Sequence, residues 1–172
     1  MPLRPGRTTR AMERPYTRIS KKKPRQSYVV GVPFPKTHQF EMGDKKGNFN
    51  TTLYLSAKNP VQIRDSSLEA SRVVAHKFLE AKLGPTNYFM KILLYPHHVI
   101  REKPIAQGAG ADRYSQGMRL AFGRPSTVAV QIKGGQRLFL LKLNKENLEL
   151  GKSALKKIGL KLPTPIRIEI EQ

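Results

Sequence analysis

Residues 96–125 read PHHVIREKPIAQGAGADRYSQGMRLAFGRP and decide how the rest of the chain is interpreted. Apolar, strand-like residues flank this stretch at 92–95 and 128–132, whereas its middle, 102–115, contains Pro104, Gly108 and Gly110 among small residues. Because glycine loses the most entropy on ordering and alanine has little area to bury, the middle predicts neither a strand nor a stable helix. A loop this long in a compact domain is either functional or disordered. It is also cationic, so we expect a protrusion that enters anionic surroundings.

The length, composition and net charge of the chain restrict the class of protein. A chain of 172 residues fits one domain with a real core. Its hydrophobic fraction of 38% is low, and its net charge of +20 requires an anionic partner, with nucleic acid as first candidate and an acidic membrane surface as second. No apolar run is long enough for a transmembrane helix, and the cationic start carries no apolar signal segment. The absence of cysteine excludes disulfides and cysteine-ligated zinc and is compatible with a reducing cytosol.

We expect two parts, a basic RNA-binding arm at 1–26 and a single α+β domain at 27–172 with its functional loop at about 102–118. Prolines block a helix in the arm, which is either a solubilising tail or a segment that orders on a polyanion, with Tyr16 available to stack on a base. Its candidate RNA contacts are basic: Arg4, Arg7, Arg10, Arg14, Arg18, Lys21, Lys22, Lys23 and Arg25.

The domain should contain two β-hairpins. The first joins 38–42 to 49–57 through a basic turn at 43–47. The second joins 126–133 to 137–143 through Gly134 and Gly135. Two further strands are expected, an apolar one at 88–95 and an alternating one at 165–171.

Two helices complete the expected fold. One begins near Asp65, where Ser66 and Glu69 have the spacing of a capping box, and ends at Gly84. The other begins at Asn144 and ends near Gly159. We therefore predict an α+β fold, with two helices packed on one face of a mainly antiparallel or mixed sheet, plus the basic arm and the long protruding loop.

Tests for catalytic chemistry are negative. Adjacent His97 and His98 on a strand point to opposite faces, so we expect no metal site and no catalytic residue. The segment 108–112 lacks the lysine ending of a P-loop and the third glycine of a dinucleotide fingerprint, so no cofactor is expected. Asp112 beside Arg113 is interpreted as a local ion pair or a turn residue.

The chemistry that remains is binding to a polyanion. We expect the protein to recognise the shape and backbone of that partner rather than to read a short sequence directly. The loop candidates for RNA contact are again cationic: Arg101, Lys103, Arg113, Arg119 and Arg124. The alternative is an RNA-modifying or RNA-cleaving enzyme that uses His98, Asp112 and Arg113. A membrane-surface protein is a third hypothesis, disfavoured because no basic amphipathic helix is present and the apolar positions point into a core.

Four strings in the central stretch resemble a known family. They are HVIR at 98–101, AGADR at 109–113, QGMR at 116–119 and GRP at 123–125. They resemble the archaeal and eukaryotic large-subunit ribosomal protein family called L-ten-e, whose bacterial counterpart is L-sixteen, and the similarity extends over nearly the whole chain. Residues 105–108 fall outside the matched strings. The chain stops at Gln172 without the long C-terminal extension of eukaryotic members, which favours an archaeal source.

The resemblance implies a structural, non-enzymatic protein of the cytoplasmic large (50S) subunit, docked on ribosomal RNA. In the family the central loop points toward the peptidyl transferase centre and the acceptor ends of tRNA in the A/P-site region. Neighbouring ribosomal proteins and assembly factors are the other implied partners, and no membrane is. Carried over, the loop is about 102–116, and its residues at the tRNA site are Gln107, Gly108, Ala109, Gly110, Ala111, Asp112, Arg113 and Tyr114.

Overall fold

The computed structural model describes residues 4–12, 22 and 29–171. Within these residues, eight strands form two antiparallel sheets. The larger sheet has the order β1-β4-β7-β2-β8. Its strands are β1 (Glu41–Gly43), β4 (Tyr88–Ile92), β7 (Arg137–Leu143), β2 (Thr51–Ala57) and β8 (Ile166–Glu171). The smaller sheet has the order β3-β6-β5, with β3 (Val61–Arg64), β6 (Arg124–Ile132) and β5 (His98–Glu102).

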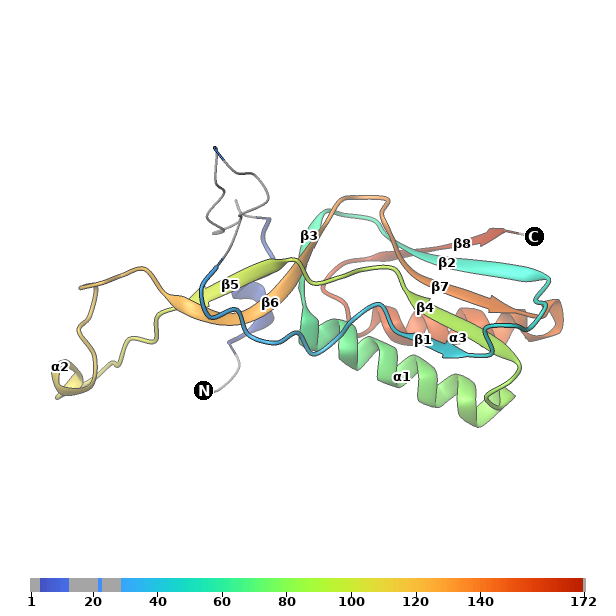
Figure 1. Ribbon diagram of the computed structural model, residues 1–172, viewed down its shortest axis with the longest axis horizontal. Coiled ribbons are helices and arrows are strands. Elements are labelled where there is room, and N and C mark those ends of the chain that lie inside the picture. The colour runs from blue at the N-terminus through green and yellow to red at the C-terminus, as the bar shows by residue number, and fades with distance from the viewer. Residues whose placement is uncertain (1–3, 13–21, 23–28, 172) are drawn as a thin grey trace.

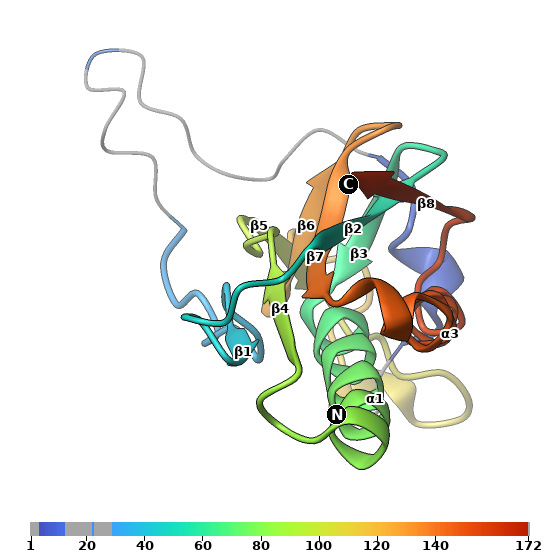
Figure 2. The same ribbon diagram turned by 90° about the vertical axis from the view of Figure 1, so that its right-hand side faces the viewer.

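Two helices cover one face of the larger sheet. Figures 1 and 2 show α1 (Asp65–Leu83) and α3 (Leu148–Gly159) on the same side of it. Fully buried side chains of α1, α3 and the sheet, such as Leu68, Leu155 and Phe139, belong to one apolar cluster. Burying each such side chain contributes about 1.5–3 kcal/mol. The predicted α+β fold with two helices on one sheet face is confirmed.

Both predicted hairpins are wrong. Strand β1 pairs with β4, placing Met42 opposite Met90, because both edges of β2 are occupied by β7 and β8. Likewise β6 and β7 belong to different sheets, because β7 lies between β2 and β4. The turn at Gly135 (φ 78°) donates its N–H to the Ala57 carbonyl at 2.7 Å, so it crosses from one sheet to the other.

The start of α1 also differs from the expected capping box. Asp65 accepts the N–H of Ser66 at 2.6 Å and the N–H of Lys36 at 3.0 Å, whereas no side-chain cap bond reaches the first turn from residue 64. Glu69 instead pairs with Arg72 one turn along. The end of the helix is as predicted, with Gly84 at φ 75°. A short 3-10 helix, η3 (Lys145–Asn147), precedes α3.

The smaller sheet carries the central loop. Strands β5 and β6 pair antiparallel from His98–Ala129 to Glu102–Arg124, and residues 103–123 connect them. Figure 1 shows this connection extending away from the larger sheet, with the four-residue helix α2 (Ala111–Tyr114) near its outer end. The expectation of no stable helix is therefore corrected by a single helical turn. Among the described residues, no helix combines the length and apolar character needed to cross a lipid bilayer.

Candidate nucleic-acid interface

Two cations hold the limbs of the loop together at its base. Arg101 on β5 donates from Nη1 to the Gly123 carbonyl at 3.1 Å, and its guanidinium carbon lies 4.4 Å from the centre of the Phe122 ring. Lys103 donates from Nζ to the carbonyl of Leu120 at 2.9 Å and also to that of Arg119. Since each acceptor lies 16–22 residues further along the chain, these bonds close the loop.

The turn that Lys103 contacts has an unusual backbone. Leu120 has φ 55°, in the left-handed region that non-glycine residues rarely adopt. Its side chain is 78% exposed, so burial of that side chain does not compensate the strain. The Lys103 ammonium bonds the carbonyls on both sides of this peptide unit and so stabilises the turn.

The outer part of the loop is small and exposed. Ser115 accepts the Ala106 N–H at 3.3 Å and donates to the Ala111 carbonyl at 3.3 Å, so its hydroxyl joins the two limbs below α2. The predicted tRNA-site residues are all exposed except Ala111, which is partly buried. Tyr114 leaves 86% of its surface exposed, so its ring is available for stacking.

Three of the predicted RNA-binding arginines are exposed and unpaired. The guanidinium groups of Arg113, Arg119 and Arg124 form no ion pair with any carboxylate in the described part of the chain. No carboxylate in the described residues therefore compensates their charge. Of the two alternatives for Asp112, the ion pair with Arg113 is not formed, whereas its place in the single helical turn Ala111–Tyr114 agrees with a turn residue.

The described beginning of the arm lies beside the loop base. The Gln62 N–H on β3 donates to the Arg10 carbonyl at 2.9 Å, and Arg64 donates from Nη1 to the Arg4 carbonyl at 2.6 Å. The Arg4 side chain lies 3.8 Å from Glu102. Arg7, within the 3-10 helix η1 (Gly6–Thr8), Arg10 and Lys22 are exposed. The other residues predicted to act in the arm lie outside the described residues: Arg14, Tyr16, Arg18, Lys21, Lys23 and Arg25.

Two hollows adjoin these cations. A cavity of about 390 Å³ separates the Arg4–Ala11 segment from β5, and its lining includes Arg101 and Lys103. A groove of about 950 Å³ runs along the inner side of the loop, and its lining includes Lys36 and Arg124. Both contain Arg4, so the start of the arm connects them. Such concave cationic surfaces fit a polyanion backbone better than a small neutral ligand.

The residues of the enzyme hypothesis are not brought together. His98 is 2% exposed in β5, opposite Ala129, whereas Asp112 and Arg113 lie in α2 near the outer end of the loop (Figure 1). Within the described ranges, no three His, Asp or Glu side chains gather in a way that would hold a metal ion.

Sequence reasoning missed three residues at this surface. Nothing in the sequence indicated a role for Glu102, yet it is the counter-charge of Arg4. Lys36 lies 67 positions before Lys103 and lines the same groove. A Cβ at Gly123 would meet the Glu102 backbone at 2.6 Å, so this glycine permits the close approach of the two limbs. The only local indication was the string at 123–125, which carried no geometric meaning by itself.

The chain is similar to known proteins over most of its length. Residues 15–169 match the family model described as "Ribosomal protein L16p/L10e". The chain is 42% identical over 172 residues to the large ribosomal subunit protein uL16 of Archaeoglobus fulgidus, covering 100% of this chain and 95% of the relative. It is 42% identical over 173 residues to that of Thermofilum pendens, covering 100% and 99%. With the Staphylothermus marinus protein, the identity is 43% over 169 residues, covering 98% and 93%.

Proposed function

The chain belongs to the L16p/L10e family of ribosomal proteins, and from this membership we propose that it binds large-subunit ribosomal RNA and shapes the tRNA site through its β5–β6 loop. It is a structural constituent of the large ribosomal subunit in the cytoplasm, where ribosomal RNA and other ribosomal proteins surround it, and not an enzyme. Its relatives are archaeal, as the sequence predicts.

The observation that carries the RNA-binding proposal is the division of the loop cations into two groups. Arg101 and Lys103 make internal bonds to carbonyls, so they first position the loop and contact RNA only with their remaining N–H groups. Arg113, Arg119 and Arg124 are exposed along the protrusion. Since a guanidinium can contact a phosphate bidentately, these three supply the main contacts to the RNA backbone.

The finer part of the proposal concerns tRNA. Small residues at 108–111 allow the loop backbone to approach another backbone closely, and the exposed Tyr114 ring offers a surface for one base. We therefore propose that the outer loop, with its base clamped, lies near the peptidyl transferase centre and the acceptor ends of A/P-site tRNA. Assembly factors that load the protein are proposed further partners of the same loop. The arm 1–26 is proposed to follow an RNA groove from the β3 edge.

Salt dependence tests the proposal. Each phosphate contact on a duplex changes the log–log salt slope of binding by about 0.9, so the double variant Arg113→Gln/Arg119→Gln should lower its magnitude by about 1.8. The matched control is Arg167→Gln, an exposed arginine on β8, which should change neither slope nor affinity. Binding is measured to a large-subunit RNA fragment across a salt series, and incorporation into 50S particles by sucrose gradient. Equal slopes for the wild type and the double variant, with equal incorporation, would refute the loop assignment.

A further inference from the structure

A group of four rings lies at the edge of the larger sheet. We call Phe34, His38, Phe40 and Tyr95 the aromatic platform. The His38 ring centre lies 5.6 Å from that of Phe34, 5.7 Å from that of Phe40 and 5.9 Å from that of Tyr95. The outer rings remain accessible, with 86% of Phe34 and 50% of Tyr95 exposed. Aromatic side chains gathered this way on a surface usually mark an interaction site.

The backbone beneath the platform is fixed. The N–H of Lys36 donates to Asp65 at the start of α1, and Thr37 is fully buried. On the other side, the Ile92 N–H donates to the Phe40 carbonyl at 3.1 Å. The segment therefore lies between α1 and the edge of the sheet, so a ligand that stacks on the rings does not have to order them first.

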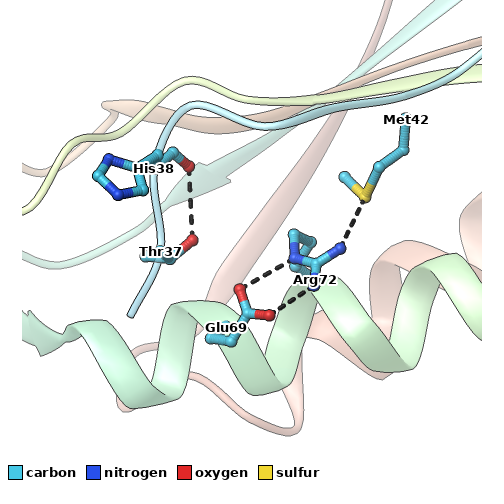
Figure 3. Close-up of polar contacts among 5 residues, drawn as sticks. All are labelled: Thr37, His38, Met42, Glu69 and Arg72. Carbon is cyan, nitrogen blue, oxygen red and sulfur yellow. Dashed lines mark hydrogen bonds and ion pairs between the residues drawn. The ribbon is translucent and has the colours of Figure 1, made fainter. Parts of the chain in front are cut away.

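Arg72 supports the platform from below. It forms two hydrogen bonds with Glu69, contacts the Met42 sulfur at 3.3 Å and places its guanidinium carbon 5.2 Å from the centre of the Phe40 ring. Figure 3 shows the His38 ring pointing away from the Arg72–Glu69 pair. The hydrogen bond from Arg72 lowers the pKa of Glu69, so this pair stays charged and closed. The rings are thus presented outward on a rigid support.

The charges around the platform favour an anionic ligand. Each neighbouring carboxylate already has a partner within the chain: Asp65 accepts two backbone N–H groups, Glu69 pairs with Arg72, and Glu41 pairs with Lys45 and Lys91. The Lys36 side chain, within the same segment, is exposed. A phosphate backbone would therefore meet an exposed cation here rather than uncompensated acids.

From these observations we infer that the aromatic platform takes one unpaired base of an RNA, stacked on the exposed rings of Phe34 and Tyr95. Base stacking on aromatic side chains is the ordinary way in which proteins hold splayed RNA bases. The Tyr95 hydroxyl can bond a base edge, as can Oε1 of Gln39, whose Nε2 donates to the Leu93 carbonyl at 3.4 Å. An apolar peptide side chain would not use either group. The inference rests on the proposed RNA-binding function and adds a second contact, made by residues outside the loop.

The test uses two RNA hairpins that differ only in a single bulged 2-aminopurine, which one of them carries and the other, fully paired, lacks. The wild type should bind the bulged hairpin at least roughly fivefold more tightly, because stacking one base on a ring contributes about that factor or more. It should also quench the 2-aminopurine fluorescence. The variant Phe34→Leu/Tyr95→Leu keeps apolar area but removes both rings, so it should lose the preference and the quenching while its affinity for the paired hairpin stays unchanged.

Two further variants make the result decisive. Phe34→Leu alone should lose part of the preference, and folding cannot depend strongly on a side chain that is 86% exposed. The matched control is Leu160→Ala, 83% exposed next to α3, which should keep the full preference. The inference is overturned if the wild type binds both hairpins equally. It is also overturned if the double leucine variant keeps the preference for the bulged hairpin, because leucine could then replace the rings through apolar contact alone. Failure of the wild type to bind even the paired hairpin in a salt-dependent manner would instead refute the proposed RNA-binding function.

Discussion

Replacement of Gly123 by alanine tests whether the loop base depends on the close approach of its two limbs. A methyl group at Gly123 would lie 2.6 Å from the Glu102 carbonyl carbon and 2.9 Å from both its nitrogen and its oxygen. All three atoms are backbone, so no side-chain rotation relieves the overlap. The carbonyl of Gly123 is also the acceptor for Arg101. Any separation of the limbs therefore weakens that bond as well.

The free-energy cost of Gly123→Ala has two contributions. Overpacking by one methyl group costs about 1–3 kcal/mol where the backbone must move. Loss of a hydrogen bond from a charged donor adds about 1.5 kcal/mol, at the low end of its range because the site is half exposed. The sum, about 3 kcal/mol, is local, because Gly123 lies outside the apolar core. It should raise the open population of the β5–β6 end about 150-fold and leave global unfolding nearly unchanged.

Hydrogen exchange followed by mass spectrometry measures this opening. In Gly123→Ala, amides near Glu102 and Arg124 should exchange roughly two orders of magnitude faster, while the core strands β2 and β7 keep their wild-type protection. The matched control is Gly108→Ala, at φ 106° with open space around its Cβ position, which strains only the outer loop. Slow, wild-type exchange at the β5–β6 end of Gly123→Ala would refute the role of this close approach.

Three other changes have defined outcomes. Lys103→Met removes both hydrogen bonds to the 119–120 turn, so chymotrypsin should cleave the loop up to about tenfold faster. An unchanged cleavage rate would contradict the role of Lys103 in holding the loop base together. The hydrogen bonds from Lys45 and Lys91 lower the pKa of Glu41 to about 2 from 4.5. The stability that this carboxylate adds is therefore present above pH 4.5 and lost as the pH falls through about 2, so the difference in urea midpoint between wild type and Glu41→Gln should close over that window. In Gly151→Ala the added methyl would overlap side chains of β2 and β7. The cost of overpacking, about 1–3 kcal/mol, outweighs the gain in helix propensity of about 1 kcal/mol, so Tm should fall by about 2–4 °C. A rise in Tm would show that the core side chains move to accommodate the methyl group.

Local patterns predicted the elements whose determinants lie within one segment. Apolar residues at helical spacing, such as Leu68, Ala75 and Leu79, and Gly84 with its positive φ lie within one segment and mark α1 and its end. The loop was equally visible, because glycine and small residues cannot build a core wherever they are placed. In both cases the energies that decide the conformation come from residues a few positions apart.

Strand partners were not predictable in this way. Alternation identifies a face of β6, but the same alternation fits any neighbour, so a short Gly134–Gly135 connection favoured pairing with β7. The structure resolves this through contacts with a third strand, since the turn bonds to the end of β2. The aromatic platform was missed for the same reason, because Tyr95 lies 55 positions from Phe40 in sequence and both contact His38.

At the candidate site, the sequence could not distinguish the cations that position the loop from those that remain uncompensated. The sequence identified Arg101, Lys103, Arg113, Arg119 and Arg124 as one group, because their charge is the only property visible in it. The structure separates them by acceptor, and the two that stiffen the loop bond to carbonyls rather than to carboxylates. A carbonyl satisfies the donor without cancelling its charge, so the loop gains rigidity and keeps its positive potential. Ion pairs at the same places would give the rigidity but remove the positive potential that we propose attracts RNA, which is why a chain with a net charge of +20 benefits from closing its loop in this manner.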